Sequence, residues 1–141
     1  MREYVISNIV LVVLDFIWLG AYMAQRYKEM VPTLQDGVEM QVKIIPAILA
    51  YVLMAIGLSV FVIPNIKSGT ILQDSLVYGA LFGIVVYGVY DFTALAVLNR
   101  WDTKLAIIDV AWGGFVYFCA AMAYGIAKYG LADLTESLGF V

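Results

Sequence analysis

Histidine is absent from this chain of 141 residues, and cysteine occurs once, as Cys119. Without histidine the chain cannot supply imidazole ligands to haem, zinc or a di-iron centre, or the base of a Ser-His pair. With one cysteine it cannot form an internal disulfide or a Cys-x-x-Cys redox motif. We therefore predict no metal site and no cofactor, and the sequence offers no catalytic residues.

Charged residues are also scarce, at 13% of the chain against about 25% in an ordinary soluble domain. Apolar residues make up 64%, the mean hydropathy is +0.93 and the net charge is −3. No basic patch suited to nucleic acid is present, so we expect no nucleic-acid partner. The composition is that of an integral membrane protein whose main partner is the lipid bilayer.

Long hydrophobic runs dominate the sequence. Four stretches without lysine or arginine are each long enough for a membrane-spanning helix, which needs about 20 residues. They cover residues 4–24, 44–63, 75–98 and 105–127. The sequence predicts an all-α, four-helix transmembrane bundle with antiparallel neighbours and both termini on one side. Residues 1–141 form a single transmembrane domain, and residues 25–43, with Pro32 and an Asp36-Gly37 turn, form an interfacial loop.

The basic residues are divided unequally between the two ends of this bundle. Five lie in loops 25–43 and 99–104 (Arg26, Lys28, Lys43, Arg100 and Lys104), and three lie on the side of the termini (Arg2, Lys67 and Lys128). Because cytoplasmic loops are enriched in lysine and arginine, we expect the termini to be non-cytoplasmic. The expected location is a plasma membrane or a bacterial inner membrane.

Three aspartates, Asp15, Asp91 and Asp109, interrupt the hydrophobic runs, and no cationic residue lies in any of those runs. A carboxylate at the centre of a membrane helix costs roughly 2.5–3.5 kcal/mol on insertion scales. Protonating an ordinary aspartate at neutral pH costs a similar amount, about 4 kcal/mol. Neither charge state is clearly favoured, so neighbouring hydrogen-bond donors must decide.

Two copies of a D-x-x-W-x-G pattern place an aspartate and a tryptophan on one helix face. They start at Asp15 and Asp109, in the first and fourth helices, which run in opposite directions. At about 1.5 Å per residue, Asp15 and Trp112 lie at similar depth, as do Asp109 and Trp18. Asp91 falls in the same layer. We therefore expect Trp112 to donate to Asp15 and Trp18 to donate to Asp109.

Small residues share one face of the third predicted helix with Asp91. The face consists of Ala80, Gly83, Tyr87, Asp91 and Ala94, and an adjoining face carries the G-x-x-x-G pattern of Gly79 and Gly83. Small residues allow membrane helices to approach closely, and we interpret this pattern as helix packing.

The candidate site combines the acids with nearby hydroxyl groups. Its members are Asp15, Asp91, Asp109, Tyr87, Tyr90 and Thr93, with Trp18, Trp112 and Tyr22 as structural partners. Three interpretations remain open: a hydrogen-bonded polar core that fixes helix register, a proton or cation site, and an acidic site that meets a partner subunit or cationic ligand.

In these motifs the chain resembles the membrane protein family catalogued as domain of unknown function 2177. The family pattern runs through D-x-x-W-L-G (15–20), G-A-L-F-G (79–83), Y-x-x-Y-D-x-T (87–93) and D-x-A-W-G (109–113), and Trp101 also fits. One departure is Ala94, where the family has asparagine three residues after the aspartate. The resemblance implies the four-helix fold and the polar layer, and it implies no particular activity.

The sequence favours proton- or cation-coupled transport centred on the aspartate layer, with a likeness to carriers built from inverted repeats. Because four helices make a thin pathway, we expect a homo-oligomer or a partner in a membrane complex. The alternative is a structural or accessory subunit of a larger complex. A lipid-acting membrane enzyme is the least favoured interpretation, because no nucleophile–base pair or cofactor motif is present.

Overall fold

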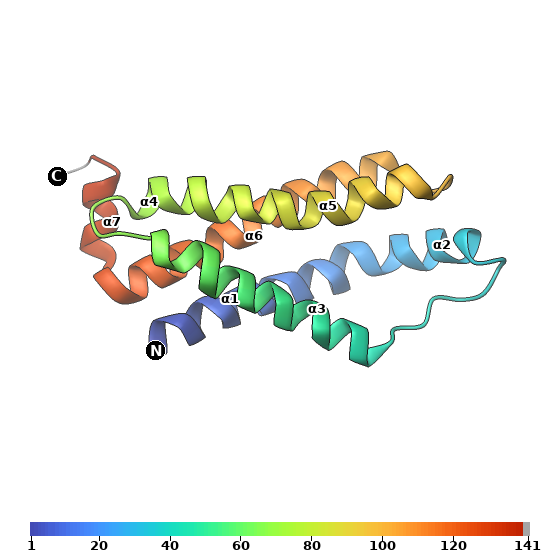
Figure 1. Cartoon of the computed structure of the whole chain (residues 1–141), viewed down its shortest axis with the longest axis horizontal. Coiled ribbons are helices and arrows are strands. Elements are labelled where there is room, and N and C mark those ends of the chain that lie inside the picture. The colour runs from blue at the N-terminus through green and yellow to red at the C-terminus, as the bar shows by residue number, and fades with distance from the viewer. Residues whose placement is uncertain (140–141) are drawn as a thin grey trace.

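The computed structural model describes residues 1–139, and this part of the chain is helical with no strand. Four helical rods are long and apolar enough to cross a membrane: Arg2–Leu34, Ile44–Asn65, Ile71–Val97 and Thr103–Tyr129. They lie side by side, and successive rods run in opposite directions, so Met1 and the C-terminal helix are at the same end (Figure 1). The predicted all-α bundle of four potential membrane spans is confirmed.

The first rod is longer than the sequence predicted. It joins α1 (Arg2–Trp18), the π-helical segment η1 (Leu19–Met23) and α2 (Ala24–Leu34). The expectation of a loop from Gln25 was wrong, because the charged segment is rich in strong helix formers. Pro32 removes one backbone donor, and α2 ends only two residues after it. The chain turns at Asp36 and Gly37, both with positive φ.

The second and third rods also contain π-helical segments. The second consists of α3 (Ile44–Gly57), η2 (Leu58–Val62) and the 3₁₀ turn η3 (Ile63–Asn65). The third consists of α4 (Ile71–Asp74), η4 (Ser75–Ala80) and α5 (Leu81–Val97). This third rod begins four residues before the predicted start at Ser75. Asp74 stabilises the preceding loop by accepting hydrogen bonds from the Lys67 N–H (3.0 Å) and the Thr70 hydroxyl (2.7 Å).

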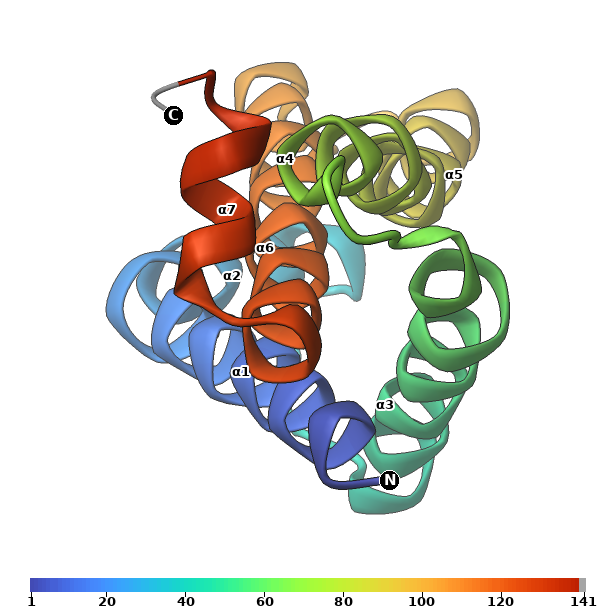
Figure 2. The same ribbon diagram turned by 90° about the vertical axis from the view of Figure 1, so that its left-hand side faces the viewer.

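The fourth rod, α6 (Thr103–Tyr129), is the central element of the bundle. It packs against α1 and α5 along their lengths. In an apolar stretch of 18 residues, 56% of the α6 residues are buried, against 11% for the rod that contains α3. Asp102 caps its start by accepting from the Leu105 N–H at 2.8 Å. Gly130, at φ 95°, ends the helix, and α7 (Leu131–Ser137) then turns away from its axis (Figure 2). The candidate site is built around α6.

Glycines bring α5 and α6 into backbone contact. A Cβ atom on Gly83 would overlap the Gly113 carbonyl group, and one on Gly79 would lie 2.9 Å from the Tyr117 carbonyl oxygen. The G-x-x-x-G pattern therefore serves helix packing, as the sequence predicted.

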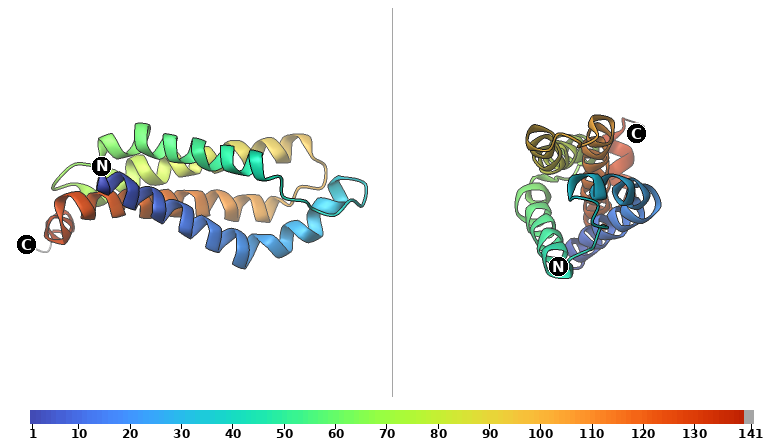
Figure 3. Two further views of the ribbon diagram at one scale, coloured as in Figure 1. Left: turned by 90° about the horizontal axis from the view of Figure 1, so that it is seen from below. Right: turned by 90° about the vertical axis from the view of Figure 1, so that its right-hand side faces the viewer.

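The first rod runs along the other side of α6, and residues 35–43 connect it to α3 beyond the end of the bundle opposite Met1 (Figure 3).

Candidate functional site

Asp15 is buried near the C-terminal end of α1 and accepts hydrogen bonds from three different rods. Its Oδ1 accepts from the Tyr87 hydroxyl at 2.5 Å and from the Trp112 indole N–H at 3.3 Å. Its Oδ2 accepts from the Tyr51 hydroxyl at 2.8 Å. Three donors therefore satisfy this carboxyl group, and it ties α3, α5 and α6 to α1.

Asp91 and Asp109 form a second group of acids, on α5 and α6. Asp109 Oδ1 accepts from the Trp18 indole N–H at 2.7 Å, and Asp91 Oδ1 accepts from the Trp101 indole N–H at 3.3 Å. Asp91 is only 1% exposed, and its Oδ2 has no hydrogen-bond donor among residues 1–139. The antiparallel contacts of Gly83 with Gly113 and of Gly88 with Val110 place these two buried acids at neighbouring levels of α5 and α6.

Each tryptophan of the two D-x-x-W-x-G copies donates a hydrogen bond to the aspartate of the other copy, on the neighbouring helix. Trp18 of α1 reaches the aspartate of α6, and Trp112 of α6 reaches the aspartate of α1, which are the two contacts that the sequence predicts. The indole rings stack on each other with centroids 4.6 Å apart, and Tyr22 stacks on Trp18 at 4.4 Å. Antiparallel packing of α1 against α6 thus joins the two copies into one unit.

No cationic side chain neutralises these acids in the part of the chain that the structure describes. The ion pairs within residues 1–139 involve only Glu3, with the N-terminal amine and Arg2. The same residues contain no group of three acidic or sulfur side chains arranged to hold a metal ion. The charge of the cluster is therefore balanced by hydrogen-bond donors or by protons.

The structure separates the other predicted members of the site. Thr93 is exposed on the outer face of α5, and Tyr90 is 56% exposed with its ring edge against Trp101 at 5.8 Å. Tyr22 contacts the cluster through ring stacking on Trp18. Ala94 is buried one turn after Asp91, where the family's asparagine would stand.

Two donors were missed as partners of the acids: Tyr51 for Asp15, and Trp101 for Asp91. Tyr51 places a hydroxyl group within an otherwise apolar run, and a hydroxyl group inside a membrane needs a hydrogen-bond partner. That signal was available in the sequence, but it names no partner. Trp101 gives Asp91 an internal partner, although one of the two carboxyl oxygens of Asp91 still lacks a donor.

Replacing Trp18 with phenylalanine should destabilise the protein in detergent more than the same change at Trp112. Trp18→Phe removes the short 2.7 Å bond to Asp109, whereas Asp15 keeps two other donors in Trp112→Phe. Interhelical hydrogen bonds in membranes contribute about 0.6–1.7 kcal/mol, so we expect about 1 kcal/mol for Trp18→Phe. Thermal unfolding measures both, and Thr93→Val, at an exposed site, is the control. Equal stability of all three variants would contradict the crossed pairs.

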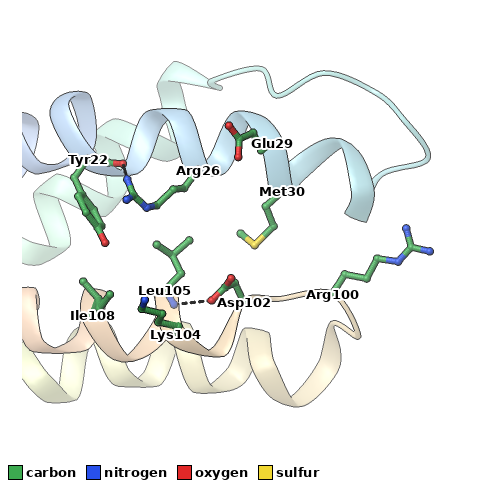
Figure 4. Close-up of a pocket in the computed structure, with 9 residues that line it drawn as sticks. All are labelled: Tyr22, Arg26, Glu29, Met30, Arg100, Asp102, Lys104, Leu105 and Ile108. Atoms are coloured by element: carbon green, nitrogen blue, oxygen red, sulfur yellow. Dashed lines mark hydrogen bonds between the residues drawn. The ribbon is translucent and has the colours of Figure 1, made fainter.

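A pocket of about 370 Å³ lies between α2 and the start of α6, next to the acid cluster (Figure 4). It is lined by Tyr22, Arg26, Glu29, Met30, Arg100, Asp102, Lys104, Leu105 and Ile108. Two of its walls adjoin the cluster, because Tyr22 stacks on Trp18 and Ile108 precedes Asp109 in the chain. The pocket lies at the end of the bundle where residues 35–43 and 98–102 connect the rods.

Fold and cluster together define a small multi-pass membrane protein with buried carboxyl groups on packed helices and no cationic partner for them among residues 1–139. Over residues 1–127 the chain matches the family described as Predicted membrane protein (DUF2177), and it belongs to that family. The resemblance seen in the sequence motifs is therefore confirmed. Comparisons with curated proteins and with solved structures gave no match.

Proposed function

We propose that this protein is a proton-coupled membrane transporter in which Asp91 and Asp109 bind and release the coupling proton. The observation that supports this most directly is the pair itself: two buried carboxyl groups at neighbouring levels of the packed helices α5 and α6, one of which has an oxygen without a donor. No lysine or arginine among residues 1–139 pairs with either group.

The chemistry of such a pair favours one shared proton. Two carboxylates side by side in a site of low dielectric constant repel each other, so a pair of this kind holds a proton more firmly than a single carboxylate does. That proton would supply the donor that Asp91 Oδ2 otherwise lacks. Removing it requires a compensating charge or a change of packing, and this requirement is what couples proton release to movement of a solute.

Asp15 has a different role in this proposal. Its three donors come from α3, α5 and α6, so the Asp15 carboxyl group is fixed in place and holds the helices together. We assign it as the structural acid of the layer and assign proton exchange to the Asp91–Asp109 pair.

The pocket next to Tyr22 and Ile108 supports a route from the loop end of the bundle to the pair. A proton or solute that enters there meets Tyr22, which stacks on Trp18, and the Trp18 indole is hydrogen-bonded to Asp109. The two antiparallel D-x-x-W-x-G copies around this point resemble the inverted repeats of carriers. Since four helices enclose little space for a pathway, we propose that the transporter works as a homo-oligomer.

Infrared spectroscopy tests the proton site directly. At neutral pH the wild-type protein should show the carbonyl stretch of a protonated carboxyl group in a dry environment, and this band should disappear as the pH is raised. Asp91→Asn should remove the band, because the remaining acid no longer shares a proton with a second carboxyl group. Asp36→Asn, at an exposed turn with no hydrogen-bonded side chain, is the matched control. A spectrum that is identical in Asp91→Asn would refute the shared proton.

Flux measurements test the transport role separately. In proteoliposomes with an entrapped pH indicator, wild type and Asp36→Asn should move protons in response to an imposed solute or ion gradient, and Asp91→Asn should not. If no gradient produces flux in the wild type, the accessory-subunit interpretation gains support, and the protein should then co-purify from native membranes in a larger complex.

A further inference from the structure

We infer that the pocket between α2 and α6 binds a phosphate-bearing anion. The pocket is separate from the proton pair, and its chemistry differs, because cations rather than acids dominate its lining. Its volume of about 370 Å³ lies within the range of small-molecule sites, which is about 300–1,000 Å³. The inference does not depend on the proposed transport.

Three cationic residues line the pocket from three segments: Arg26 of α2, Arg100 of the loop before α6, and Lys104 of the first turn of α6. The Arg100 side chain points outward in Figure 4, and its Nη1 donates to the Thr33 carbonyl oxygen at 3.4 Å. None of the three cationic groups lies within 4.0 Å of a carboxylate oxygen in the described residues. Positive groups without an acidic partner at the wall of a pocket favour an anion with several oxygens, and arginine is well suited to phosphate because its donors form a planar fork.

Arg26 is held in position for this role. Its Nη1 donates to the Tyr22 carbonyl oxygen at 2.7 Å, and its guanidinium group stacks over the Tyr22 ring at 3.6 Å from the centroid. Figure 4 shows both side chains at the inner end of the pocket. A guanidinium group has five N–H donors, so most of its hydrogen-bonding capacity remains available to a ligand.

The two acids of the pocket are already engaged by local partners. Asp102 Oδ1 accepts the hydrogen bond that caps α6, and Glu29 Oε1 accepts from the Gln25 side chain at 3.2 Å. The lining therefore carries three cations against two acids that serve the backbone or a neighbouring side chain. Basic pockets between membrane helices at this level bind lipid headgroups, and a free phosphate ion has the same chemistry.

Titration of the full-length protein in a zwitterionic detergent tests the site and identifies the source of the anion. Three probes are compared by tryptophan fluorescence, because Trp18 stacks on the pocket residue Tyr22: short-chain phosphatidylglycerol, short-chain phosphatidylcholine and inorganic phosphate. The variants are Lys104→Gln and the double change Arg26→Gln with Lys104→Gln. Lys43→Gln, an exposed lysine on the same side outside the pocket, is the control.

We expect a phosphate-bearing anion to bind more tightly than phosphatidylcholine. Each lost cation should weaken binding about fivefold, so the double variant should be about 25-fold weaker and Lys43→Gln unchanged. Tighter binding of phosphatidylglycerol identifies a lipid headgroup, and equal or tighter binding of inorganic phosphate identifies the free ion. Equal binding of phosphatidylcholine, or an unchanged Kd in Lys104→Gln, which has no hydrogen bond to lose and should fold normally, would overturn the inference.

Discussion

Replacing Gly83 with alanine should separate α5 from α6 and lower the free energy of unfolding by about 3 kcal/mol, with loss of the native fold as the extreme result. The added Cβ would overlap the carbonyl group of Gly113 in the middle of α6, where no flexible side chain can move aside. Because Asp91 lies two turns further along α5, the same shift would pull it away from Asp109. Reversible unfolding in mixed micelles measures the effect.

Gly20→Ala is the matched control for this change. Gly20 is also helical, but it is exposed, and a Cβ there has nothing within 4 Å. Alanine has the higher helix propensity, so this variant should be as stable as the wild type or slightly more stable. Similar unfolding of Gly83→Ala and Gly20→Ala would show that α5 and α6 do not meet at Gly83 in the membrane protein.

The second large effect is expected for Asp15→Leu. This change leaves the Tyr51 and Tyr87 hydroxyls and the Trp112 indole without their acceptor in the interior of the bundle. At about 0.6–1.7 kcal/mol for each interhelical hydrogen bond in a membrane, the three together amount to about 2–5 kcal/mol. Thermal unfolding in detergent gives the measurement, and Asp15→Asn, which keeps one acceptor oxygen, should fall between wild type and Asp15→Leu.

A double-mutant cycle separates these hydrogen bonds from loss of packing. Tyr87→Phe should destabilise the wild-type protein by removing the 2.5 Å bond to Asp15, but it should cost almost nothing in the Asp15→Leu background. Additive effects of the two changes would mean that the tyrosine hydroxyl and the carboxyl group do not interact.

Much of the polar layer follows from the sequence because helix geometry is regular. A rise of about 1.5 Å per residue sets the depth of each side chain, so Asp15 and Trp112, or Asp109 and Trp18, can be matched by counting. The i, i+3 spacing then puts each tryptophan on the same face as its own aspartate. Both crossed contacts are present in the structure.

Other features of the site could not be predicted from the spacing of residues along a helix. The donors Tyr51 and Trp101 lie on segments whose rotation toward the acids depends on packing, and Thr93 was expected near the layer but lies on the outer face. The extension of α2 to Leu34 was missed because charge and Pro32 suggested a loop, although the residues favour helix.

The amino-acid sequence is sufficient to predict four apolar helices, three acids that interrupt them without a cation, and small residues along the third helix. These properties depend on composition and on distance along one helix. Which faces meet depends on the tertiary structure: it places Asp91 and Asp109 at neighbouring levels of α5 and α6, gives Asp15 three donors, and lines one pocket with Arg26, Arg100 and Lys104. The physical reason is that the rotation and approach of helices are set by close contacts such as Gly83 against Gly113, which no single helix contains.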